Sequence, residues 1–273
     1  MDNFILSEIN IYPVKSLGGI SLNESKVEKR GLQYDRRWVL VGRDDNMFIT
    51  QREINTLCLF RPSFDNNGFK ITNDRHSSYV NIPFGIETGE KANVTIWSDT
   101  CEAIHFSDEI DKWFSDITGY NCKLMYMPDT SRREADKNFA ISDDIVSFAD
   151  AFPVLVIGQS ALDKYNNISG DNFKMNRFRP NIVFTGGEAH LEDTWKKFEL
   201  SGTDFYSVKQ CSRCNITTIE QETGIAGKEP LKTLATYRNF DNKIKFGTYC
   251  IPGELKDDSI LKLGSELKIL DTA

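Results

Sequence analysis

Two cysteines separated by two residues form the most distinctive chemical feature of this sequence. Cys211 and Cys214 enclose Ser212 and Arg213, and Lys209 precedes them. Positive neighbours favour the thiolate form of a cysteine, and thiolates bind soft metals well. The segment therefore indicates a metal or redox site, although two structural thiols buried in a pair of strands are an equally good interpretation of the pair alone.

Zinc binding and dithiol exchange are the two familiar alternatives for such a pair. Four ligands would close a structural zinc site, but the sequence contains no second CxxC, and its three histidines are dispersed. A redox dithiol is typical of a helix start, whereas the β-branched residues after Cys214 predict a strand over residues 215–219. Both alternatives are disfavoured, although folding could still gather distant zinc ligands.

The other four cysteines are isolated in the sequence, and no signal peptide precedes them. A disulfide framework is therefore not expected. Cys58, Cys122 and Cys250 stand beside apolar or aromatic neighbours, where cysteine usually serves as a small core residue.

The charge balance limits the partners that the protein can have. The 33 lysines and arginines face 40 aspartates and glutamates, so the net charge is −7. This charge disfavours a general nucleic-acid or anionic-membrane surface, and any anion site must be a local basic pocket.

The sequence shows no secretory signal and no apolar stretch approaching the ~20 residues of a membrane span. We therefore expect a cytoplasmic protein with no membrane association.

Short strand-like runs separated by Asn, Asp and Gly turns dominate the chain and predict a mostly β fold with few helices. In the first half, strands are expected over 4–11, 38–41, 69–71, 79–82 and 93–97, followed by a helix between Ser107 and Gly119. In the second half, helices are expected near 160 and after Pro230, with strands over 182–184, 206–208 and 246–251 and near 261 and 269. Two domains, 1–122 and 123–273, are expected, with a polar linker near 128–144.

Several segments, taken together, resemble a known family. The matching C-terminal segments are Cys211 to Cys214, Thr217-Thr218, Thr223-Gly224, Glu229 to Leu231, Thr233-Leu234, Tyr237-Arg238 and Phe246-Gly247. Earlier matches are residues 11–16, 35–38 and 177–183. In order and spacing, these follow the mitochondrial amidoxime-reducing component and its bacterial relatives, which are MOSC-domain proteins. The resemblance covers nearly the whole chain and implies an N-terminal MOSC-type β-barrel domain followed by a MOSC β-barrel domain.

The resemblance also implies a cofactor and the residues that hold it. Cys214 corresponds to the protein ligand of molybdenum in the molybdenum cofactor, and Cys211 is then structural. Lys15, Ser16, Arg36 and Arg179 correspond to positions that hold the pterin and its terminal phosphate, a group that cationic and hydroxyl donors suit. The pocket is expected at the interface of the two domains. Pyridoxal phosphate binding is a further property associated with the family, for which no residue is assigned.

Two more residues match positions beside the metal. Asn181 matches a residue that lines the metal site, and Asp150 matches a carboxylate close to the metal's oxygen ligand, where an acid could relay protons. The chain departs from the animal members at Ala151 and Phe152, where those members carry small polar residues. Trp195 also matches, but its apolar neighbours indicate core packing.

The activity implied by the resemblance is the reduction of N-hydroxylated compounds, such as amidoximes, hydroxylamines and N-hydroxylated bases, to amines. The sequence contains no dinucleotide fingerprint, flavin motif or iron–sulfur cysteine pattern, so a separate flavin or iron–sulfur protein is expected to supply the electrons. One alternative is a cofactor carrier or a sulfur-transfer protein that uses a persulfide on Cys214. Another is a binding module of the same fold without metal chemistry.

Overall fold

Seven strands close into a barrel in this computed structural model, which describes residues 3–86 and 88–273. Around the barrel the order is β12 (Val154–Gly158), β13 (Ile182–Thr185), β1 (Phe4–Ile11), β19 (Glu266–Thr272), β14 (Trp195–Leu200), β15 (Thr203–Ser212) and β17 (Lys243–Pro252). β17 pairs again with β12, which closes the ring. The inner face is apolar and includes Leu6, Phe184, Phe198 and Phe205.

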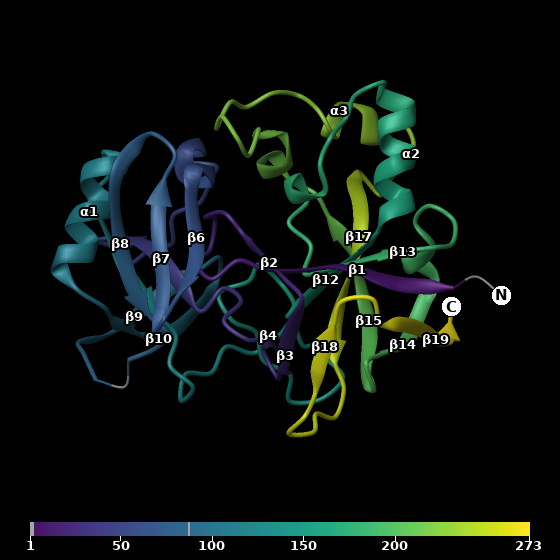
Figure 1. Cartoon of the computed structure of the whole chain (residues 1–273), viewed down its shortest axis with the longest axis horizontal. Helices are drawn as coiled ribbons and strands as arrows, with labels where there is room; N and C mark the ends of the chain where they lie inside the picture. Colours follow the sequence, from purple (N-terminus) through teal and green to yellow (C-terminus); the bar gives the residue numbers. More distant parts are fainter. Residues whose placement is uncertain (1–2, 87) are drawn as a thin grey trace.

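The first strand of the chain belongs to this barrel rather than to the sheets that follow it in sequence. β1 pairs with β13 through Ile9 and Ile182 and with β19 through Phe4 and Leu267. Figure 1 shows β1 running from the N-terminus into the C-terminal half of the molecule. Both halves of the sequence therefore contribute strands to one barrel.

The remaining N-terminal strands form a second region. One sheet has the order β5 (Trp38–Gly42), β11 (Cys122–Tyr126), β10 (Asp99–His105) and β9 (Lys91–Ile96), and a meander is made of β6 (Phe60–Asp65), β7 (Gly68–Asn73) and β8 (His76–Pro83). Helix α1 (Asp108–Thr118) packs against this region through Phe114, which lies with Trp38 and Phe69 in its core. Figure 1 shows the two regions side by side, with α1 at the outer edge.

The shorter elements join the two regions and decorate the barrel. β18 (Ile260–Lys262), β3 (Glu24–Glu28) and β4 (Gly31–Leu32) form a small sheet, while β2 (Ile20–Leu22) pairs with β1 and β16 (Asn239–Phe240) with β17. The other helices are α2 (Gln159–Ser169) and α3 (Leu231–Leu234), and the 3-10 helices are η1 (Asn55–Leu59), η2 (Met175–Arg177), η3 (Leu191–Thr194) and η4 (Asn215–Thr218). Within the described residues, no helix has the length and apolar character needed to cross a bilayer.

The fold class is as the sequence predicted, but one predicted strand is wrong. Residues 215–218 form the 3-10 helix η4 instead of a strand. The hydroxyls of Thr217 and Thr218 donate to the carbonyls of Cys214 and Asn215, three residues earlier. These local bonds offer the backbone an alternative to sheet pairing, and they override the β preference of the side chains.

The polar segment near 128–144 has irregular structure, yet buried side chains anchor it. Arg133 is 5% exposed and donates hydrogen bonds to the carbonyls of Ser147 and Ala149. Arg30 donates to three carbonyls at the start of the segment, including that of Ser131. The path of the chain into the second half is therefore fixed by buried arginines.

Candidate functional site

A single pocket between the two regions brings together all seven residues that the sequence predicted for the site. Lys15, Ser16, Arg36, Asp150, Arg179, Asn181 and Cys214 all line it. The first three belong to the N-terminal part of the chain and the others to the second half. The structure thus places the predicted residues at one location, whereas their roles there stay predictions.

Three of these residues share an unusual backbone conformation. Ser16, Arg36 and Arg179 have φ values of 70°, 50° and 54°, in the left-handed region that side chains other than glycine rarely occupy. Strain of this kind persists only where the surroundings impose it, and it concentrates at ligand sites. The backbone of the loops around the pocket is therefore locally strained, and this conformation directs the three side chains into the pocket.

Lys15 is a buried cation with a carboxylate partner. It is 5% exposed, and its Nζ lies 2.8 Å from the carbonyl oxygen of Phe148 and 2.5 Å from Oδ1 of Asp150. Burial lowers the pKa of Lys15, and Asp150 opposes this effect. Burial alone would raise the pKa of Asp150, but the charge and hydrogen bond of Lys15 outweigh it, so the pKa falls well below its usual value. The two groups therefore form an ion pair at neutral pH.

Arg36 and Arg179 lie on the ring of Tyr12. Their guanidinium carbons are 4.3 Å and 4.1 Å from the ring centroid. Arg36 also donates to Asp35 at 2.6 Å, and burial, which would lower its pKa, is outweighed by this carboxylate so that the pKa rises. Burial lowers the pKa of Arg179 to about 10, and Arg179 forms no ion pair with a carboxylate among the described residues. Both arginines are thus charged at neutral pH and oriented by an aromatic ring.

Asn181 connects the two halves beneath the pocket. Its Oδ1 accepts hydrogen bonds from the backbone N–H of Leu155 and from Arg36, and its Nδ2 donates to the carbonyl of Asn10. The side chain is 1% exposed. These three hydrogen bonds use most of the donors and acceptors of the Asn181 amide, and they orient its neighbours, including the guanidinium of Arg36.

The two cysteines have different surroundings. Cys211 lies in β15, is 2% exposed, and accepts a hydrogen bond from Arg213 at 2.9 Å. Cys214 lies two residues after the end of that strand, at the N-cap of η4, and is half-buried. Its sulfur accepts a hydrogen bond from Arg52 at 3.1 Å. Of the two thiols, Cys214 is therefore the more accessible from the pocket, as expected for a ligand position.

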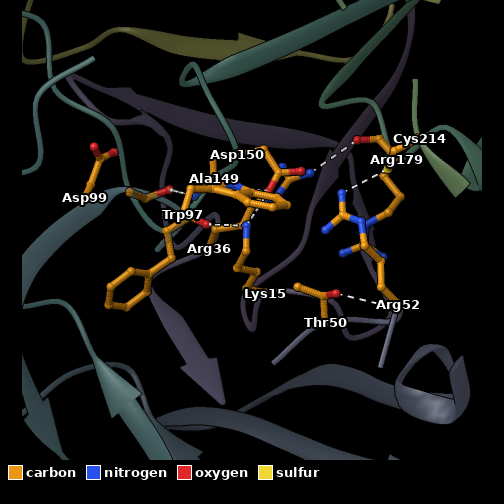
Figure 2. A network of polar contacts seen from close by, with 12 residues as sticks. Lys15, Arg36, Thr50, Arg52, Trp97, Asp99, Ala149, Asp150, Arg179 and Cys214 are labelled. Carbon is orange, nitrogen blue, oxygen red and sulfur yellow. Dashed lines mark hydrogen bonds and ion pairs between the residues drawn. The ribbon is translucent and has the colours of Figure 1, made fainter. Parts of the chain in front are cut away.

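Arg52 and Trp97 are the site residues that sequence reasoning missed. Arg52 lies on the face of Trp97, 4.6 Å from the ring centroid, and the Trp97 indole N–H is 3.3 Å from Oδ1 of Asp150. Figure 2 shows this chain of contacts running from Lys15 to Cys214. Neither residue stands in a motif, so no local signal could have found it.

The pocket is a basic site on an acidic protein. Five cations lie in or beside it, namely Lys15, Arg36, Arg52, Arg179 and Arg213, with Asp35 and Asp150 as the paired carboxylates. Because the net charge is negative, the sequence predicted that any anion site would be a local basic pocket of this kind. The arrangement can attract an anion and present one accessible thiol to it.

Of the two residues that depart from the expected pattern, Ala151 and Phe152, only Phe152 is among those that line the pocket. Phe152 is 2% exposed and packs against Tyr249 with ring centroids 5.5 Å apart, so an apolar surface stands where relatives are expected to carry a small polar residue.

Trp195 is buried with Phe4 and Phe184, which confirms its core role. Cys58, Cys122 and Cys250 are also buried, as predicted.

Comparison with known proteins gives matches along most of the chain. Residues 3–121 match the MOSC N-terminal beta barrel domain, and residues 143–268 match the MOSC domain. The chain is 30% identical over 252 residues to mitochondrial amidoxime reducing component 2 of Rattus norvegicus, covering 88% of this chain and 74% of that protein. It is 26% identical over 281 residues to mitochondrial amidoxime-reducing component 1 of Mus musculus, covering 97% and 82%.

A second group of relatives is much longer than this chain. Molybdenum cofactor sulfurase of Arabidopsis thaliana is 29% identical over 265 residues, which cover 89% of this chain but 32% of that protein. The chain thus spans about a third of the length of the sulfurases that it matches.

Proposed function

Because this chain belongs to the MOSC family, we propose that it is a molybdenum-cofactor oxidoreductase that reduces N-hydroxylated compounds with electrons from a separate donor protein. The observation that carries the proposal is the position of the Cys214 thiol, which faces the same pocket as Lys15, Arg36 and Arg179. A soft metal needs a thiolate, and a terminal phosphate needs cations. One pocket supplies both.

The residues of the pocket fit the cofactor by their chemistry. Cys214 would ligate the metal, and Lys15, Ser16, Arg36 and Arg179 would hold the pterin and its phosphate. When bound, the cofactor supplies two-electron chemistry at molybdenum, and the protein supplies binding and orientation. Among the residues that the structure describes, the buried Nε of Arg213 has no hydrogen-bond partner, and it adds a further donor at the wall of the pocket.

The ion pair of Lys15 and Asp150 would serve proton movement. Reduction of an amidoxime breaks the N–O bond, consumes two electrons and two protons, and releases water. Since Asp150 is ionised at neutral pH, its carboxylate would accept hydrogen bonds and orient a water molecule, whereas Lys15 Nζ is the group of the pair that carries exchangeable protons. Asn181 would act by orienting Arg36.

The alternative is a carrier or sulfur-transfer role for Cys214. The similarity to molybdenum cofactor sulfurases favours it, although the shared part is only a third of those proteins. A carrier would retain the cofactor without turnover. A sulfur-transfer protein would show a persulfide on Cys214, which mass spectrometry detects as one added sulfur atom.

The test compares electron sources on protein from a host that makes the cofactor. With NADH or NADPH alone, we expect no reduction of benzamidoxime, because the sequence shows no recognisable dinucleotide fingerprint and no flavin or iron–sulfur motif. With a strong artificial donor, benzamidine should form. Stoichiometric oxidation of NADH by the pure protein would contradict the need for a donor. A molybdenum-loaded protein that is inactive with every donor and a broad panel of substrates would favour the carrier.

A further inference from the structure

Arg52 is a cation at the rim of the pocket for which the proposed cofactor contacts give no role. Lys15 and Arg36 each have a carboxylate partner, whereas Arg52 forms no ion pair with a carboxylate among the residues that the structure describes. Its guanidinium instead contacts the sulfur of Cys214 and the ring of Trp97. A cation without a carboxylate partner beside an accessible thiol is available to an incoming anion.

Trp97 holds this cation in place. It occupies the turn between β9 and β10 with a φ of 57°, and 45% of its surface is exposed. One side packs on Phe48, with ring centroids 4.9 Å apart, and its N–H reaches Asp150. The backbone N–H of Arg52 is fixed by the hydroxyl of Thr50 at 3.1 Å. The ring and the backbone together limit where the guanidinium can lie.

Arg52 and Trp97 come from a different part of the chain than the residues that they contact. Arg52 and Trp97 come from the N-terminal region, while Cys214 and Asp150 come from the second half of the chain. The pair therefore joins the two parts of the chain and contacts both residues expected nearest the metal. Figure 2 shows Arg52 below Cys214 at the right of the view, with Trp97, Asp150 and Lys15 at its centre.

We propose that Arg52, held on the face of Trp97, selects small molecules that carry a carboxylate or another anionic group and directs them to Cys214. The selection of anionic reagents at the thiol follows from the contacts of Arg52 with Cys214 and Trp97 and does not depend on the proposed function. The extension to substrates, namely N-hydroxylated compounds bearing a carboxylate, rests on the proposed function. Arg52 and Trp97 are then the residues that set specificity at the rim.

The first test uses the cofactor-free full chain and the thiol itself. Cys214 is half-buried while Cys58, Cys101, Cys122, Cys211 and Cys250 are buried, so alkylation of the native protein is expected at Cys214. The thiolate displaces iodide from iodoacetate, which is anionic, or from iodoacetamide, which is neutral, and forms a sulfur–carbon bond. The ratio of the two rates at Cys214, followed by peptide mass spectrometry, measures attraction of the anion.

Arg52→Gln should lower this ratio about three- to tenfold, the effect of one partly exposed charge. Arg52→Lys should retain part of it. The matched control is Arg132→Gln, because Arg132 is half-exposed and lies outside the pocket beside Glu134 and Asp143. Trp97→Ala should lower the ratio and Trp97→Phe should largely preserve it, which tests the ring even if Arg52→Gln does not fold. An unchanged ratio in folded Arg52→Gln or in Trp97→Ala overturns the proposal.

The second test uses molybdenum-loaded protein with an artificial donor. Arg52→Gln should raise KM for 4-carboxybenzamidoxime at least threefold more than KM for neutral benzamidoxime, as expected for the loss of one charge contact. Equal changes for both substrates would refute the specificity role. If the wild-type protein reduces neither substrate, the proposed function fails, and the alkylation ratio still decides the role of Arg52.

Discussion

At the scale of residues, the sequence could identify the site only through combined motifs. Lys15, Arg36 and Arg179 are separated by many residues, and each alone reads as a surface charge, yet the structure places them in one pocket. Arg52 and Trp97 could not be found because their role depends on a contact between a loop and a hairpin turn. Such contacts leave no trace in local spacing.

The phosphate role of two cations leads to a prediction about salt. Lys15→Gln and Arg179→Gln should retain less cofactor than the wild type, and the deficit should change with ionic strength, because charge-assisted contacts are partly screened. The measurement is pterin and molybdenum content after dialysis at low and high salt. The conservative variant Arg179→Lys should lose less. Unchanged content in both Gln variants would place the anion site elsewhere.

Glu192 supports a prediction about pH and stability. It is fully buried, and its Oε2 has no hydrogen-bond partner in the described part of the chain. Burial, aided by Asp193, raises its pKa from the ordinary 4.5 to about 7. Between these values the folded protein binds more protons than the unfolded chain, so this group's contribution to stability falls as pH rises from about 4.5 to about 7.

Glu192→Gln removes this dependence. Relative to wild type, the variant should gain stability between pH 5 and pH 8, by up to about 3 kcal/mol at ~1.4 kcal/mol for each unit of pKa shift. Urea unfolding of both proteins at the two pH values measures the difference. His190, whose pKa burial lowers to about 3, acts in the opposite direction but equally in both proteins. A difference that is the same at pH 5 and pH 8 would contradict the prediction.

At the scale of elements, local sequence patterns predicted whether a segment forms a helix or a strand better than they predicted which strands pair with each other. The helix α1 lies between Ser107 and Gly119 as predicted. Within the described residues the Ser107 side chain makes no cap hydrogen bond, and three acidic residues occupy the first turn instead. The strand predicted over 215–219 is wrong because two threonine hydroxyls bond to nearby carbonyls. The pairing of β1 with β13 and β19 joins ends of the chain that no local pattern connects.

The place of β1 in the barrel leads to a prediction about stability. Leu6 is fully buried and lies opposite Phe184 of β13. Leu6→Ala should therefore destabilise the protein by about 2–5 kcal/mol, as large cavities in a core do. Leu270→Ala in β19 is the control, because Leu270 is 50% exposed and should cost less than about 0.5 kcal/mol. Thermal or urea unfolding distinguishes them, and equal costs would mean that β1 is peripheral.

At the scale of the whole molecule, the fold explains why the pocket lies where it does. The chain begins in the barrel, crosses to the N-terminal sheets and returns, so the loops after β1 and before β12 meet between the two regions (Figure 1). Lys15 and Asp150, one from each loop, form an ion pair there. The sequence predicted two β-rich parts and a shared pocket, but it could not predict that β1 joins the second part.

Cys214, within this basic pocket, is the proposed protein ligand of the molybdenum cofactor, and the molybdenum content per chain tests this assignment. Wild type, Cys214→Ser and Cys211→Ser would be purified together from a host that makes the cofactor. Cys211→Ser is the matched control because a serine oxygen can still accept the hydrogen bond from Arg213. We predict molybdenum near one per chain in wild type and Cys211→Ser, and a loss of most of it in folded Cys214→Ser. Equal molybdenum in both variants, or its absence from all three with stoichiometric zinc instead, would contradict the assignment.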